Sequence, residues 1–238
     1  MKTHMFTLTV AALMQWPFVG FCFASDHLVP LKTDMATIDP KMPVYDCAPF
    51  QTKVKPCEPE LLEAPLIEVP KNTINLSKGK PVTSSDDMPV IGDLELITDG
   101  KKVLGQEEQV ELKEGLQWVQ IDLGHECDIN VIWVWHCFNV QQKICKIAFR
   151  DVVVQVSNNE KFDDAVSTVF NNDTDNSAKL GKGSDKAYIE TRFGKPIVLE
   201  KPIKGRYVRL YSNGHDRSEA NSYVEVEVFG SPSEPDKK

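Results

Sequence analysis

Apolar and polar residues alternate with a period of two in four segments of this chain: residues 118–123, 151–157, 206–212 and 223–229. In the first segment, apolar residues at every second position alternate with Gln120 and Asp122. Side chains of a β-strand point to opposite faces in turn, so this pattern predicts strands with one buried face.

Two further stretches complete the strand pattern. Residues 129–135 are apolar on both faces, which predicts a central strand covered on both sides. Residues 188–191 and 197–199 are expected to pair as a hairpin around residues 193–196. No stretch sustains a helical period, and Gly, Asn, Asp and Pro turns separate the strands. The pattern therefore favours an antiparallel sandwich or barrel.

The first residues have the composition of a secretory signal. Lys2 precedes an apolar stretch over residues 6–23, no acidic residue occurs before Asp26, and the small Ala24 suits cleavage after it. The stretch is short and interrupted by Pro17, which disfavours a membrane span, although an uncleaved anchor is the alternative. We expect residues 1–24 to be a signal peptide and the protein to be secreted or held in the periplasm or cell envelope.

The segments flanking the strands lack a period. Prolines recur over residues 25–70, which predicts an extended Pro-rich leader, the alternative being a short motif that binds a partner. Residues 231–238 consist of Ser, Pro and charged residues and are expected to form a disordered tail. One domain over residues 71–230 remains.

The net charge and the number of cysteines limit the kinds of binding partner and the cellular compartment that the sequence suggests. The net charge of −8 argues against nucleic acid and makes an anionic membrane lipid an unlikely partner, although it leaves room for a local basic patch. The cysteines beyond the predicted signal peptide are odd in number, so an exported chain keeps at least one free or intermolecular thiol. Cys47 with Cys57, and Cys137 with Cys145, are close enough in sequence to pair, and Cys127 is the fifth. Sequence alone fixes no connectivity.

Several short motifs follow one another along the chain, at residues 75–85, 97–100, 118–124, 151–157, 205–210 and 224–230. Their order resembles the discoidin family, also called F5/8 type C. This resemblance, over residues 72–230, implies an all-β, galactose-binding-like jelly-roll β-sandwich that binds ligands through loops at one end and performs no chemistry. Family members bind glycans, membrane lipids or proteins. Residues 135–136, 150–152 and 170–177 look most like the glycan-binding variants of secreted bacterial proteins.

The resemblance also implies a structural calcium ion. Asp99 in the first loop and Glu225 in the last strand match the family's carboxylate ligands by position, and calcium requires oxygen ligands. Lys101 and Lys102 follow where the family has Asn or Thr, so turn chemistry at Asp99 is the alternative. A second acidic loop, over residues 173–177, has the oxygen spacing with which a calcium loop opens, but it lacks the required Gly and is better explained as a turn.

A sugar site needs polar groups for the hydroxyls and an aromatic face for the C–H side of the ring. His136 ends one predicted strand, Arg150 precedes the next, and His215 and Asn221 belong to the loop over residues 213–222. Consecutive antiparallel strand ends lie at the same end of a sheet, so these four side chains are expected at one rim. Trp135 is the nearest aromatic candidate, although strand alternation points it away from His136. Structural hydrogen bonding is an equal alternative for each residue.

Motifs of catalysis and nucleotide binding are missing, since no GxSxG, P-loop or dinucleotide fingerprint occurs. The sequence therefore predicts a non-catalytic, secreted carbohydrate-binding module whose partner is a glycan or glycoconjugate. The alternative is an envelope protein-interaction or cell-adhesion domain that binds another envelope protein and no sugar. Binding to membrane lipid is disfavoured, because the predicted loop tips carry Asn, Asp, Ser and His in place of exposed apolar residues.

Overall fold

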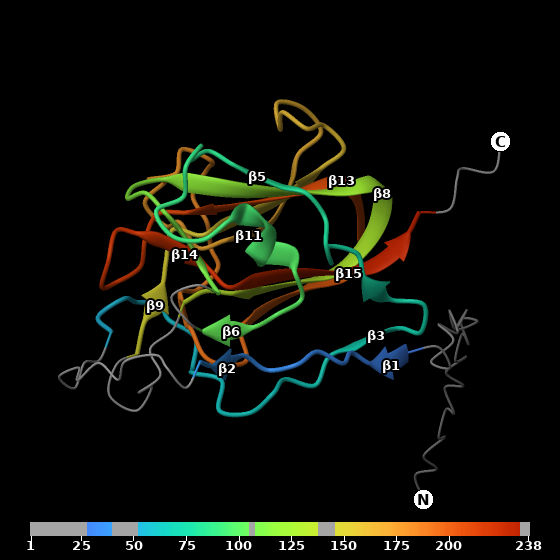
Figure 1. Cartoon of the computed structure of the whole chain (residues 1–238), viewed down its shortest axis with the longest axis horizontal. Coiled ribbons are helices and arrows are strands. Elements are labelled where there is room, and N and C mark those ends of the chain that lie inside the picture. Colours follow the sequence, from blue (N-terminus) through green and yellow to red (C-terminus); the bar gives the residue numbers. More distant parts are fainter. Residues whose placement is uncertain (1–27, 40–51, 105–107, 138–145, 234–238) are drawn as a thin grey trace, which may run out of the picture.

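The computed structural model of the chain describes residues 28–39, 52–104, 108–137 and 146–233 (Figure 1). The predicted signal peptide lies outside these residues. The described elements are strands and one 3-10 helix, η2 (Leu94–Thr98). None of the described residues forms a helix with the length and apolar composition needed to cross a membrane.

The strands are short except for two. They are β1 (Leu28–Pro30), β2 (Thr37–Ile38), β3 (Glu68–Pro70), β4 (Ile74–Asn75), β5 (Val82–Ser84), β6 (Val103–Leu104), β7 (Val110–Leu112), β8 (Gln117–Trp135), β9 (Ala148–Phe149), β10 (Val153–Ser157), β11 (Ser167–Asn171), β12 (Tyr188–Ile189), β13 (Lys195–Ser212), β14 (Asn221–Tyr223) and β15 (Glu225–Pro232).

The long strands β8 and β13 fold one sheet into two layers. The order of the seven-stranded antiparallel sheet is β11-β10-β13-β8-β15-β4, with β5 also paired to β8. Residues 117–122 of β8 pair with residues 207–212 of β13, and residues 127–134 pair with residues 195–205. Between these halves the register shifts and β8 bends, as its curve in Figure 1 shows. Bulges of this kind let a strand turn the corner of a sandwich.

The core lies between the two layers. Each period-two segment contributes apolar residues to it, including Ile121, Val154, Leu210 and Val226. At the corner, Gly205 leaves room for a neighbour, because a Cβ there would lie 2.2 Å from Cγ1 of Val156. The predicted all-β sandwich is confirmed. The predicted hairpin is wrong: β12 pairs with β9, and residues 197–198 pair with β8.

A second apolar cluster covers the outer face of β8 and β15. Ala36, Ile67 and Val69 from the N-terminal segments pack against Trp133 and Trp135. β1 pairs with β3, and β2 pairs in parallel with β6. The interpretation of residues 25–70 as a linker is therefore corrected for the part that the structure describes. These residues are extended, but they belong to the sandwich, and they explain why residues 129–135 are apolar on both faces.

The C-terminal boundary also shifts. β15 continues to Pro232, and residues 231–232 pair with β8, so the predicted tail begins later than expected. Residues 234–238 lie outside the described part of the chain.

Candidate functional site

The loops predicted to meet at one end of the sandwich do meet there. The ring of Phe149, in β9, stacks on His136 with centroids 4.1 Å apart and lies 5.2 Å from the ring of His215. The loop after β13 is tied to β9, since the N–H of Asp216 donates to the carbonyl of Ala148 at 3.1 Å. The ends of β8, β9 and β13 therefore form one rim.

Two depressions open at this rim. The larger has a volume of about 640 Å³, within the range of small-molecule sites, and the smaller about 240 Å³. Both are bordered by Val54 and Arg150, so they adjoin across this pair. The larger is lined by Lys53, Val54, Arg150, His215, Asp216, Arg217, Ser218 and Glu219, and the smaller by Val54, Lys55, Pro56, Arg150, Asp151, Asn172, Thr174, Asp175 and Ala187.

Arg150 lies at the centre of the two depressions. Its side chain is 44% exposed, and Nη1 pairs with the carboxylate of the buried Asp151. Burial raises the pKa of Asp151, and the adjacent guanidinium opposes that rise. A guanidinium carries five N–H donors, so this pairing leaves other donors of Arg150 available to a ligand.

His215 offers a flat neutral ring. Its Nδ1 accepts the backbone N–H of Arg217 at 3.2 Å, which places the ring proton on Nε2. Burial lowers the pKa of His215, so the imidazole is uncharged at neutral pH. Supported by Phe149, the ring supplies a planar surface of the kind a sugar ring packs against.

The other three predicted ligand residues have structural positions. His136 is 1% exposed, its Nδ1 bonds to the carbonyl of Ser222 at 2.7 Å, and burial lowers its pKa to about 4. Trp135 lies in the second apolar cluster, stacked on Trp133. Asn221 is 1% exposed, and its side chain bonds to three backbone groups of neighbouring loops. Their placement as ligand contacts is therefore corrected: His136 and Asn221 bond to the backbone of the rim loops, and Trp135 belongs to the second apolar cluster.

One wall of the site comes from the N-terminal segment, a role that the sequence did not reveal. Residues 53–56 border both depressions. The segment is fixed there, because Glu58 N–H donates to the carbonyl of Ala187 at 2.7 Å, Ala187 N–H donates to the carbonyl of Pro56 at 3.1 Å, and Lys195 pairs with Glu58 at 2.6 Å. Proline recurrence concealed this role, since it signals extended backbone without saying what that backbone packs against.

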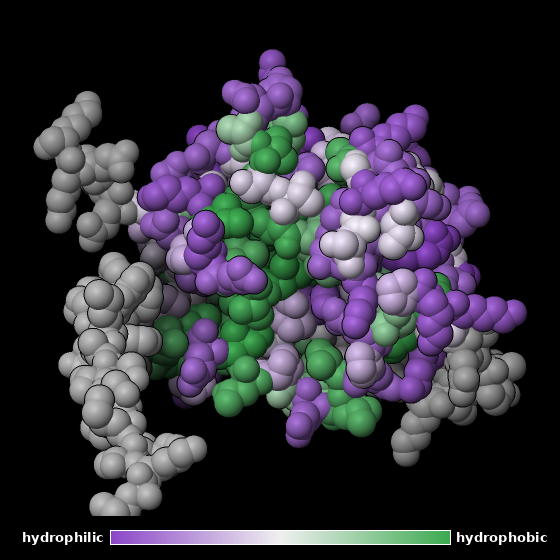
Figure 2. Space-filling view, turned by 180° about the vertical axis from the view of Figure 1, so that it is seen from behind, coloured by the Kyte–Doolittle hydropathy of each residue, from purple (hydrophilic) through white to green (hydrophobic). Residues whose placement is uncertain are grey.

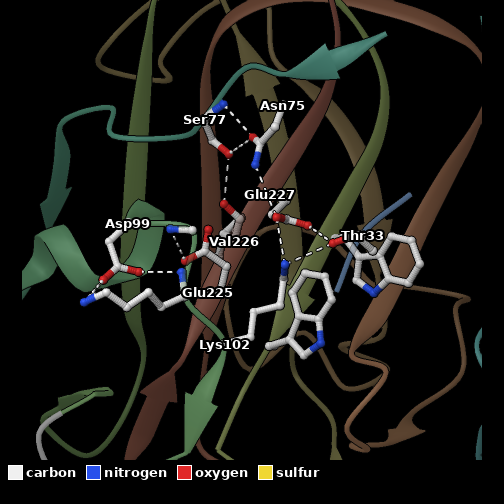
Figure 3. Close-up of polar contacts among 12 residues, drawn as sticks. Thr33, Asn75, Ser77, Asp99, Lys102, Glu225, Val226 and Glu227 are labelled. Carbon is white, nitrogen blue, oxygen red and sulfur yellow. Dashed lines mark hydrogen bonds and ion pairs between the residues drawn. The ribbon is translucent and has the colours of Figure 1, made fainter. Parts of the chain in front are cut away.

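The position expected for calcium is occupied by protein donors (Figure 3). Gly100 N–H donates to Oε2 of Glu225 at 3.2 Å, and Lys101 N–H donates to Oδ1 of Asp99 at 2.7 Å. The ammonium of Lys101 pairs with the second oxygen of Asp99 at 3.3 Å. Calcium takes six to eight oxygen ligands. Of the four carboxylate oxygens of Asp99 and Glu225, only Oε1 of Glu225 has no partner among the described residues, so this pair does not fit a calcium ion.

The acidic loop behaves as the turn interpretation expects. Oδ1 of Asp173 accepts the N–H of Ser177 at 3.0 Å, and Oδ2 accepts the N–H of Ala178 at 2.8 Å. Carboxylate oxygens of Asp151, Asp173 and Asp175 lie within 4.8 Å of one another. The buried Asp173 is nevertheless engaged in closing its own loop.

A further depression of about 840 Å³ lies away from the rim, between the N-terminal segment and β15. Its buried polar residues, Lys102 and Glu227, bond to each other at 2.8 Å. The rim, by contrast, combines the exposed guanidinium of Arg150 with the ring of His215, and for that reason it is the candidate ligand site.

Comparisons with known proteins complete the description. No family model and no curated protein matches the chain. Similar solved structures include chitosan-binding module 1 of a chitosanase/glucanase from Paenibacillus sp. IK-5, at 19% identity and a TM-score of 0.46, covering 66% of this chain and 99% of the module. Another is the family 32 carbohydrate-binding module of Clostridium perfringens NanJ in complex with galactose, at 12% identity and 0.46, covering 66% and 98%. A fucose-binding module of Streptococcus pneumoniae, SpX-3, has 19% identity and 0.44, covering 65% and 96%.

Proposed function

We propose that this protein is a non-catalytic carbohydrate-binding module that holds a saccharide in the depressions at the loop end of the sandwich. The observation that supports it is the pairing of an exposed planar donor, Arg150, with a neutral ring, His215, at the border of a depression of about 640 Å³. Sugars combine hydroxyls that need donors with a C–H face that packs on flat rings, so this pair meets both needs.

The cellular context is part of the same proposal. The signal-like residues 1–24 favour export to the cell envelope or beyond, where glycans are accessible. The net charge of −8 argues against nucleic acid as the ligand. A binding role without catalysis agrees with the lack of enzyme motifs in the sequence.

The test is a glycan array probed with the full chain, followed by calorimetric titration of the saccharides that bind. Arg150→Ala is expected to weaken binding at least tenfold, because a sugar hydroxyl then loses a charged donor worth roughly 1.5 to 3 kcal/mol. The matched control is Arg192→Ala, which removes an exposed arginine that lines neither depression. An empty array, or equal binding by both variants, would contradict the proposal.

An envelope protein partner is the second candidate, because apolar side chains are exposed. Leu62 and Leu66 are 83% and 81% exposed, and Figure 2 shows apolar side chains gathered in a band over the back of the molecule. Exposed patches of this kind mark protein contacts. Free monosaccharide distinguishes the candidates, since it competes with a glycan for the rim and leaves a protein contact on the apolar band intact.

A further inference from the structure

The positive and negative side chains around the two depressions differ in how accessible they are to a ligand. The lining contains the cations Lys53, Lys55, Arg150 and Arg217 and the acids Asp151, Asp175, Asp216 and Glu219. Formally they cancel. Their side chains, however, differ in burial and in partners, and a ligand meets only the accessible ones.

Two of the four acidic side chains are already bonded within the protein and are poorly accessible to a ligand. Asp151 has a side chain 4% exposed and is paired with Arg150. Oδ1 of Asp216 accepts the N–H of Ala148 at 3.0 Å, and Oδ2 is buried. Asp175 and Glu219 are the acids that remain exposed.

All four cations remain exposed. Neither Lys53 nor Lys55 forms an ion pair among the residues that the structure describes. Both lie on the segment that precedes the sandwich and is fixed to Ala187. In a chain of net charge −8, these two lysines bring unpaired positive charge to the wall of the site.

Resting on the proposed function, we propose that the site selects saccharides that carry a negative charge, and that Lys53 and Lys55 of the N-terminal segment provide this selectivity. The charge is either a carboxylate, as in a uronic acid, or a sulfate ester. Arg150 and His215 hold the sugar ring, and the lysines supply positive charge for its anionic substituent, Lys53 from the larger depression and Lys55 from the smaller. The N-terminal segment thus adds a specificity wall to a site otherwise built by the loops of the sandwich.

The experiment compares oligosaccharides matched in linkage: a neutral one, its uronic-acid counterpart and its sulfated counterpart, each titrated into the full chain. We expect at least one anionic form to bind at least tenfold more tightly than the neutral form, with the preference shrinking in high salt as charges are screened. The double variant Lys53→Met, Lys55→Met is expected to lose that preference while retaining its affinity for the neutral form. Lys32→Met is the matched control, since Lys32 is an exposed lysine that borders only the depression away from the rim.

The outcomes separate the two claims. If the neutral form binds as tightly as both charged forms, or the double variant keeps the preference, selectivity by these lysines is overturned and the proposed glycan binding stands. If no saccharide binds, the proposed function itself fails. A preference for carboxylate over sulfate, or the reverse, identifies which group supplies the charge.

A second inference concerns Lys102, a buried lysine that pairs with Glu227, two residues along β15 from the expected calcium ligand Glu225 (Figure 3). The side chain of Lys102 is 5% exposed. Its ammonium bonds to Oε1 of Glu227 at 2.8 Å and to Oγ1 of Thr33 at 3.0 Å, and it lies 4.7 Å from the ring centroid of Trp135. Thr33 in turn donates to the other oxygen of Glu227. The cation therefore links the first loop, the last strand and the N-terminal segment.

We infer that Lys102 replaces a divalent ion as the structural cation of this sandwich, so that the fold needs no calcium. The carboxylate of Glu227 is buried two residues along β15 from Glu225, and a buried carboxylate needs a cation beside it. Lys102 supplies that charge from the chain itself. It also reaches Thr33, which couples the N-terminal segment to the same cluster.

Thermal unfolding of the full chain with EDTA and with added calcium is the test. We expect a Tm that changes by less than about 1 °C in either condition, because a ligand that does not bind the native state cannot stabilise it. Lys102→Met should lower the Tm by about 10 °C, since it strands Glu227 in the interior. Lys101→Met, which removes the exposed neighbouring lysine, should change the Tm by only about 1 to 2 °C.

If Lys102→Met fails to fold, Thr33→Val provides the milder probe and should lower the Tm by a few degrees. A fall of the wild-type Tm with EDTA, a rise with calcium, or equal effects of the Lys101 and Lys102 variants would overturn the inference.

Discussion

Glu225 gives the stability of this protein a distinctive dependence on pH. Its side chain is fully buried, and burial, with the neighbouring Glu227, raises its pKa from the ordinary 4.5 to about 9. Between these values the native chain holds a proton that the unfolded chain has lost. The stabilisation is therefore complete below about pH 4.5 and is lost as the pH rises through about 9, at about 1.4 kcal/mol per pH unit.

His136 acts in the opposite direction, so the pH window matters. Folding lowers its pKa from 6.5 to about 4, and its contribution is lost as the pH falls through that range. Below about pH 6.5 the pH dependences that Glu225 and His136 give to the free energy of unfolding have opposite signs and offset each other. Above about pH 6.5 only the contribution of Glu225 remains of these two. From about pH 7 to pH 9 we expect Glu225 to reduce the free energy of unfolding by at most about 3 kcal/mol.

Urea unfolding at several pH values measures this slope. Glu225→Gln keeps the shape of the side chain but does not titrate, so its free energy of unfolding should fall less steeply with pH than that of the wild type. Glu190→Gln should flatten the slope in the same direction, because Glu190 is also buried with a raised pKa, at the other end of the sandwich near His136. The matched control is Glu114→Gln, which makes the same change at an exposed glutamate. Equal slopes for the wild type and Glu225→Gln would refute the reasoning, and would indicate that a cation keeps Glu225 ionised.

Three further predictions follow from the packing. His136→Ala should lower the free energy of unfolding in urea by about 3 kcal/mol, because the stack on Phe149 is lost. The glycan affinity of the folded protein should stay unchanged, since the ring is 1% exposed. A large loss of affinity would instead mean that His136 contacts the ligand. Ala36→Asp should destabilise by about 3 kcal/mol or more, because Ala36 is 2% exposed in the second apolar cluster, whereas an unchanged Tm would mean that the N-terminal segment is dispensable. Peptide mapping without reduction should find Cys57 as a free thiol, although Cys47, its candidate partner, lies outside the described residues, and a peptide that links Cys57 to Cys47 would contradict this expectation.

The strand faces could be predicted from sequence because alternation along a strand does not depend on the partner strand. The same rule placed His136, Arg150, His215 and Asn221 at one end, since consecutive antiparallel strand ends meet there. It also identified residues 129–135 as covered on both sides, without revealing which segment covers the second face.

Which polar side chains reach the surface was decided by the tertiary structure alone. Arg150 and His215 border the depressions, whereas His136 and Asn221, of similar chemistry and equal proximity to strand ends, bond to backbone groups beneath them. How deeply the side chains of a loop are buried depends on the aromatic rings that pack beneath the loop, and those rings come from segments distant in sequence. Strand period carries no information about that depth.

The N-terminal segment and the buried lysine show the same limit. Recurrent prolines determine an extended backbone, but its docking on Ala187 depends on hydrogen bonds between residues far apart in the chain. In the sequence, Lys102 argued against a calcium site, because the sequence gives the sign of its charge but not where the ammonium group lies in the folded chain. Only the folded chain places its ammonium 2.8 Å from Glu227, where burial turns a lone charge into the partner of a carboxylate 125 residues away.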